Sequence, residues 1–200
     1  MIPKAALLFL AATLGVLPAA AHAHSPVEGM NEFYNGVLHP LLVPAHILLI
    51  LATGLFIGQR GPRENRLALP AFFLAAAAGL ALAGAGVAPD TVGGLLLAGT
   101  TAIGLLTAAG RRAPLPLYPA AGAFAGFFLG FDSTPEALDG RERILALVGT
   151  GVGLNLWLIY ACGIADFFSK KPWQRVGLRI LGSWVAASSI LVLALTASSR

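Results

Sequence analysis

The sequence contains little cysteine and little charge. Charged residues make up 11% and hydrophobic residues 57% of the 200 residues, whereas soluble domains carry roughly 25% charged residues. This composition excludes a soluble domain and predicts an integral membrane protein embedded in the lipid bilayer. The single cysteine, Cys162, excludes an intrachain disulfide and a zinc site built from several cysteines.

Patterns typical of enzymes and of nucleic-acid-binding proteins are also missing. The sequence has no HExxH motif, no glycine-rich phosphate loop after a strand and no Ser/His/Asp set, so we do not expect an enzyme. Many of the lysines and arginines behind the net charge of +4 stand in short loops between apolar runs. Loop residues of this kind orient membrane proteins, and we expect no nucleic-acid partner.

The first 23 residues have the pattern of a cleaved signal peptide. Lys4 supplies a positive start, Ala5–Leu17 an apolar core, and the Ala-His-Ala sequence at 21–23 a cleavage site before His24. The apolar core is shorter than the roughly 20 residues of a spanning helix, which argues against the alternative, an uncleaved seventh helix. Cleavage gives His24 a free α-amino group, and the amine and the imidazole together can chelate a metal ion.

Six apolar runs follow the signal, each with the ~17–25 residues that a membrane-spanning helix needs. They cover residues 36–58, 67–88, 92–110, 114–131, 144–168 and 176–197. No long soluble segment separates them. We therefore predict an all-α fold with one domain, residues 24–200, that forms a bundle of six transmembrane helices.

The loops between these runs alternate in charge. Loops 59–66, 111–112 and 169–175 are basic, whereas the segment before the first run and the loop that contains Glu136 are richer in acids. Basic loops stay on the cytoplasmic side. We predict a multi-pass protein of the bacterial inner membrane with both mature termini in the periplasm, in agreement with the signal peptide.

Glycines recur at every fourth residue in two of the runs. Gly122, Gly126 and Gly130 share one face of the fourth predicted helix, and Gly149 and Gly153 share one face of the fifth. Small residues at this spacing let helix backbones touch in membranes. We predict that these two helices cross each other near the centre of the bundle.

The most informative feature is a pair of histidines in the first apolar run. His39 and His46 are seven residues apart, so on a regular helix they share a face but differ by roughly 10 Å in height, too far to bind one ion together. Pro40 and Pro44 can kink or open the helix between them. Two interpretations therefore stay open: one distorted metal site, or two successive stations along a path. Imidazoles inside a span indicate a functional site, and neutral histidine is the commonest metal ligand.

Other polar residues offer weaker candidates. Glu28, Glu32 and His24 lie just before the first run and could gather cations. Asn155 lies inside the fifth run, where it either hydrogen-bonds a neighbouring helix or coordinates an ion. Asp166 is predicted to pair with Lys170, four residues later.

Buried hydroxyl groups are expected to serve their own helices. Thr100, Thr101 and Thr107 lie within the third apolar run. We expect their hydroxyls to bond the preceding turn instead of lining a pore.

The histidine segment resembles a known family. The sequence HPLLVPAH at 39–46, together with six spans and a histidine at the mature terminus, is similar to the HupE/UreJ proteins. These are hydrogenase and urease accessory proteins regarded as nickel or cobalt permeases, whose first helix reads H-P-x-x-G-x-D-H. This chain has Val43 for the motif glycine and Ala45 for the motif aspartate. A histidine-rich F-H-G-x-A-H-G-like segment of the family is replaced by FAGFFLG at 124–130.

The resemblance implies an inner-membrane permease for a divalent transition metal, nickel or cobalt, with His39 and His46 as ligands. Without the motif aspartate, only neutral imidazoles remain inside the span, so His24 and Glu32 are candidates to complete the site at its mouth. Two alternatives stay open. One is a copper-binding membrane protein that uses the amine and imidazole of His24, since such ligands suit Cu(II). The other is a non-transporting accessory or assembly subunit that binds metalloenzyme maturation proteins.

Overall fold

The structure is a computed structural model that describes residues 29–87, 92–135 and 138–198. Within these ranges all regular structure is helical. The helices are, in chain order, α2 (Glu32–Leu42), α3 (Pro44–Gly58), α4 (Pro62–Gly84), α5 (Val92–Ala109), α6 (Leu117–Phe131), α7 (Gly140–Phe167) and α8 (Pro172–Ser198). The predicted signal peptide, His24 and Glu28 lie outside the described residues.

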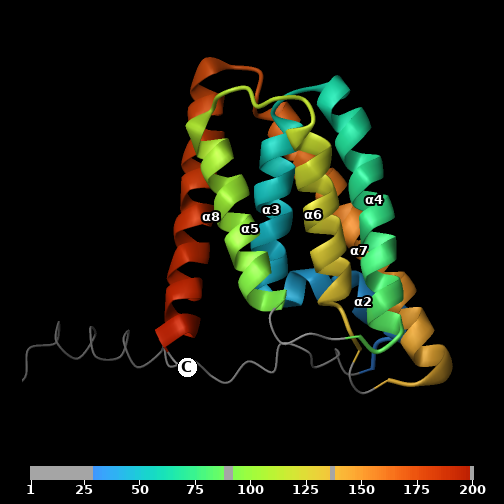
Figure 1. The fold of residues 1–200 in the computed structure, drawn as a ribbon. Helices are drawn as coiled ribbons and strands as arrows, with labels where there is room; N and C mark the ends of the chain where they lie inside the picture. The colour runs from blue at the N-terminus through green and yellow to red at the C-terminus, as the bar shows by residue number, and fades with distance from the viewer. Residues whose placement is uncertain (1–28, 88–91, 136–137, 199–200) are drawn as a thin grey trace, which may run out of the picture.

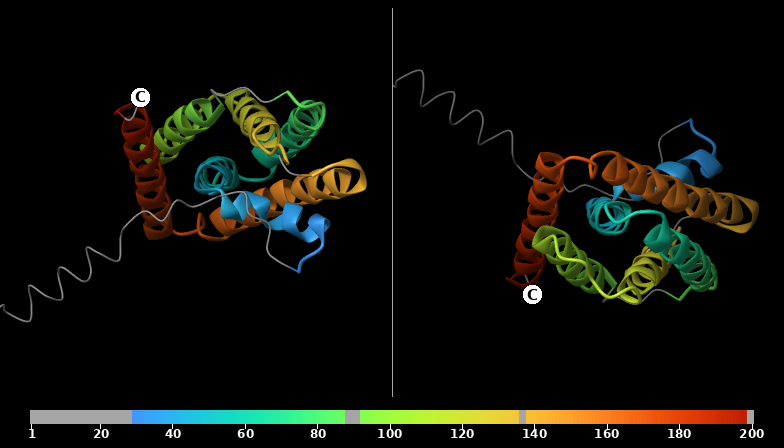
Figure 2. Two further views of the ribbon diagram at one scale, coloured as in Figure 1. Left: turned by 90° about the horizontal axis from the view of Figure 1, so that it is seen from below. Right: turned by 90° about the horizontal axis from the view of Figure 1, so that it is seen from above.

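The helices form a bundle around α3 (Figure 1). Seen end-on, α3 lies inside a ring made by α4, α5, α6, α7 and α8 (Figure 2). Many α3 side chains are accordingly buried, among them Leu49, Phe56 and Ile57 with no exposed surface. Polar groups on α3 therefore lie at the centre of the protein, away from lipid.

The prediction of six spans is confirmed only in part. Helices α4, α5, α7 and α8 are long and apolar enough to cross a membrane, and the bent pair α2–α3 makes a fifth candidate. Helix α6 is apolar but has 15 residues, about 22 Å at 1.5 Å per residue, less than the ~30 Å of a hydrocarbon core. The protein is thus a multi-pass helical membrane protein.

The first predicted span, 36–58, is broken into two helices. Val43 separates α2 from α3 with extended backbone at φ −100° and ψ 111°, and the two axes meet at 74°. Proline explains the position of the break: the residue before a proline is disfavoured in the helical region, and Pro44 is the first residue of α3. Helix α2 consequently lies across one end of the bundle (Figure 1).

Glycines allow close backbone contact between helices, but not between the pair that the sequence predicts. A Cβ atom at Gly122 would lie 2.6 Å from the carbonyl oxygen of Ala68, and one at Gly126 would overlap that of Phe72. These glycines therefore pack α6 against α4.

The glycines of α7 have another partner. A Cβ atom at Gly149 or Gly153 would overlap the carbonyl oxygens of Phe33 and Val37, so these residues pack α7 against α2. The predicted crossing of α6 and α7 through their glycine faces is wrong. The spacing of small residues indicates that another helix packs closely against this face, but it does not indicate which helix.

Candidate metal site

The candidate site lies where α2 ends, α3 begins and α6 ends. His39 stands in the last turn of α2, and His46 is the third residue of α3. Because the chain bends at Val43, the two imidazole rings lie 5.4 Å apart between centroids, with an interplanar angle of 75°. The roughly 10 Å separation expected on a regular helix therefore does not hold for this segment, because the bend brings the two rings together.

A carboxylate joins the pair from another helix. Asp132 follows the last residue of α6, and its Oδ2 lies 2.9 Å from Nε2 of His46. The His46 side chain is completely buried, whereas that of Asp132 is 29% exposed. The expectation that only neutral imidazoles remain at this site was wrong, because an acidic residue 86 positions away supplies a negative charge.

The contact with Asp132 determines how a neutral His46 can act. A carboxylate accepts a hydrogen bond, so Nε2 of a neutral ring carries the proton and donates it, which leaves Nδ1 with a free lone pair. Nδ1 is buried and has no hydrogen-bond partner among the described residues. Metal-ligating histidines usually donate their second N–H to a carboxylate or carbonyl in this way. In a neutral His46 the nitrogen available to accept a bond is therefore Nδ1.

The spacing of the two rings allows both imidazoles to reach one ion. Metal–imidazole bonds are about 2.0–2.1 Å long, so two ligating nitrogens can lie at most about 4 Å apart. Rings 5.4 Å apart between centroids can present nitrogens at that spacing, since each nitrogen lies off the ring centre. Within the described ranges, no group of three or more His, Cys, Asp or Glu side chains already stands in place to hold a metal. The structure brings together two imidazoles and a carboxylate that contacts one of them.

The local sequence explains how α2 is held in place. Asn31 caps α2 through its side chain, which accepts a hydrogen bond of 2.9 Å from the backbone N–H of Phe33. The indole N–H of Trp157 donates to the carbonyl of Val37 at 3.0 Å. These contacts, with the glycine contacts of α7, fix the helix that carries His39.

The remaining predicted site residues lie elsewhere. Glu32 is the first residue of α2, two helical turns before His39, or about 10 Å along the axis. Asn155 donates to the carbonyl of Gly151 in its own helix at 2.8 Å, and not to a neighbouring helix as predicted. It lines an apolar groove of about 770 Å³ between α4 and α7. None of the residues that line this groove belongs to α2 or α3.

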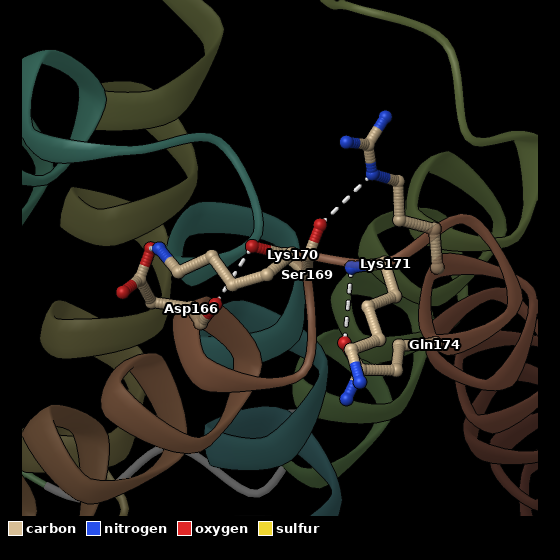
Figure 3. A network of polar contacts seen from close by, with 6 residues as sticks. Asp166, Ser169, Lys170, Lys171 and Gln174 are labelled. Carbon is tan, nitrogen blue, oxygen red and sulfur yellow. Dashed lines mark hydrogen bonds and ion pairs between the residues drawn. The ribbon is translucent and has the colours of Figure 1, made fainter.

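One predicted contact is confirmed at the other end of the bundle, where further polar contacts join the loops. Lys170 donates to Asp166 at 2.6 Å, as its spacing predicts, and Arg175 donates to the carbonyl of Ser169 at 2.8 Å (Figure 3). Arg60 also reaches the carbonyl of Arg111 at 2.6 Å. The basic loops after α3, α5 and α7 thus share one end of the bundle, opposite to α2 (Figure 1).

Fold and site together define a class: a polytopic helical membrane protein with a buried histidine pair beside a carboxylate. The comparisons with known proteins agree. The family model described as HupE / UreJ protein matches residues 10–192, and the chain belongs to this family, which is associated with nickel and cobalt accessory or permease functions and is not known to contain enzymes. No curated protein and no solved structure matches the chain.

Proposed function

We propose that this protein moves a divalent transition metal, nickel or cobalt, across the bacterial inner membrane, and that the ion is bound by His39 and His46. The observation that carries this proposal is the contact between the buried His46 and Asp132. A completely buried imidazole with a free Nδ1 has little structural value, because an unpaired buried polar atom costs about 1–3 kcal/mol. The cost is understandable if a ligand occupies that atom during function.

The chemistry of the donors suits a divalent transition metal, and the family association favours nickel or cobalt among them. Imidazole is a good ligand for nickel, copper, zinc and iron, and a carboxylate nearby offsets part of the charge of a divalent cation. The ion approaches from the end of the bundle that carries α2, where His39 is half-buried near the 74° break in the backbone. Irregular backbone within a membrane is tolerated where it lines a polar cavity. Water or the amine and imidazole of His24 complete the coordination, and Glu32, about 10 Å from His39 along α2, adds negative charge on the approach to the site.

The charges at the two ends indicate how the protein is oriented in the membrane, and inward movement is part of our proposal. By the positive-inside rule, the end with the basic loops faces the cytoplasm, and the end with α2 and Asp132 faces the periplasm. Uptake then begins at the histidine pair and ends at the basic side.

Uptake of labelled nickel, cobalt and copper into cells tests the proposal. His46→Ala and His39→Ala should each abolish uptake of the preferred metal while protein abundance in the membrane stays unchanged. Asp166→Asn, which removes a carboxylate at the opposite end, is the matched control and should transport normally. If wild-type and empty-vector cells take up all three metals equally, the accessory-subunit alternative replaces transport. A preference for copper that depends on His24 favours the copper alternative.

A further inference from the structure

Helix α3 carries one more unusual polar group. Thr53 has no exposed surface, and its hydroxyl has no hydrogen-bond partner among the described residues. A buried polar group left unsatisfied costs about 1–3 kcal/mol. Thr53 therefore needs an explanation of its own.

The other buried hydroxyls show that a simple solution was available. Each of the other buried serines and threonines within the described ranges donates to the carbonyl four residues earlier, at 2.6–3.0 Å: Thr100, Thr107, Ser133, Thr150 and Ser189. This back-bonding is the usual arrangement for such residues within helices. The hydroxyl of Thr53 does not donate to the carbonyl four residues earlier, that of Leu49.

The position of Thr53 relates it to the histidine site. It follows His46 by seven residues, almost two full turns, so both lie on the same side of α3, about 10 Å apart along the axis. His46 contacts Asp132 at the end of α6, and Phe56 stacks on Tyr118 near the start of α6 at 4.8 Å between ring centroids. Along the axis of α3, Thr53 lies between these two contacts, on the part of the central helix that runs alongside α6.

We propose that the Thr53 hydroxyl is a second polar station for the ion, reached after it leaves His46 on its way to the basic end of the bundle. This inference rests on the proposed function. The hydroxyl oxygen contacts the ion or a water molecule that travels with it. A single neutral oxygen is a weak ligand compared with imidazole, which suits a station from which an ion must leave: conduction requires binding that is favourable enough to enter and weak enough to release.

The test compares three variants in the full-length protein. Thr53→Val removes only the hydroxyl and keeps the branched shape, and Thr53→Ser restores it. Thr100→Val is the matched control, since it removes a buried hydroxyl that is bonded to its own helix. For Thr53→Val we expect the maximal uptake rate of the preferred metal to fall at least about tenfold, because a contact to a charged group in the path is lost. The KM for uptake and the affinity of the purified protein for the metal should stay unchanged, because the histidine pair is intact.

The conservative variants decide between a functional and a structural role. Thr53→Ser should recover most of the uptake, and Thr100→Val should transport as the wild type does. If Thr53→Val transports at the wild-type rate, or if Thr53→Ser is as impaired as Thr53→Val, the hydroxyl is not a station and the inference is wrong. Failure of the proposed function has a different signature, because the wild type itself would then show no uptake above empty-vector cells.

Discussion

Replacing Asp132 by asparagine removes the negative charge beside His46 and little else. The amide oxygen of asparagine can still accept a hydrogen bond from Nε2 of His46 at the 2.9 Å position of the carboxylate, so the ring keeps its orientation. What is lost is the negative charge that makes the imidazole a stronger donor to a metal and offsets the charge of the ion. Changes to such partners of metal-ligating histidines typically reduce affinity by about 10–100-fold. We expect a loss in this range, equivalent to roughly 1.4–2.7 kcal/mol at 1.36 kcal/mol per factor of ten.

A second substitution separates charge from the hydrogen bond. Asp132→Ala removes the acceptor altogether and leaves both ring nitrogens of the completely buried His46 unpaired. The folded protein should then lose about 1–3 kcal/mol of stability in addition to its metal affinity. Asp132→Asn should unfold close to the wild-type temperature.

Equilibrium titration with nickel and cobalt in detergent, alongside thermal unfolding, measures both quantities. Asp166→Asn serves as the control, because Asp166 pairs with Lys170 at the other end of the bundle and should leave metal affinity unchanged. Metal affinity of Asp132→Asn within twofold of the wild type would refute the reasoning, since the carboxylate would then contribute nothing to the site.

Three further predictions concern helix packing, orientation in the membrane and removal of the signal peptide. Gly126→Leu should lower the unfolding temperature, because the added side chain pushes α6 away from the carbonyl of Phe72, at a cost of about 1–3 kcal/mol for overpacking. Gly163→Ala should leave the unfolding temperature unchanged, because a Cβ atom there meets no atom within 4 Å. Equal unfolding temperatures for the two variants would contradict the close contact between α6 and α4. A cysteine at exposed Arg112 should not react with an impermeant thiol reagent in intact cells, whereas a cysteine at exposed Glu142 should react. Cys162 is buried and should give little background labelling. The reverse pattern would invert the proposed topology. N-terminal sequencing of the membrane protein should begin at His24, and a start at Met1 would remove His24 from the metal site.

Hydropathy and charge were sufficient to predict the class of fold. Long apolar runs predict helices in a membrane because only helices and closed barrels satisfy the backbone there, and α4, α5, α7 and α8 confirm this. Local spacing also predicted the Asp166–Lys170 pair and the back-bonding of Thr100, Thr101 and Thr107. In each of these cases the partners are four residues apart, about one helical turn.

The site could be predicted only in part. The sequence indicated His39 and His46, and the flanking prolines suggested that a distortion could bring them together, but the 74° angle of the break depends on how α2 packs against α7. Asp132 could not be predicted as part of the site, because its contact with His46 spans 86 residues and depends on where α6 ends. One signal could have indicated it: an acidic residue directly after an apolar run, at the end of the bundle that also holds the histidines. The partners of the glycine faces depended in the same way on tertiary packing.

We propose above all that the break between α2 and α3 brings His39 and His46 close enough to bind one metal ion. X-ray absorption spectroscopy of the purified protein, loaded with one equivalent of nickel, counts the imidazoles bound to the ion. We predict two histidine ligands at about 2.0–2.1 Å in the wild type, and one in His39→Ala and in His46→Ala. A spectrum of His39→Ala identical to that of the wild type would show that the two histidines do not share an ion, and would contradict the account.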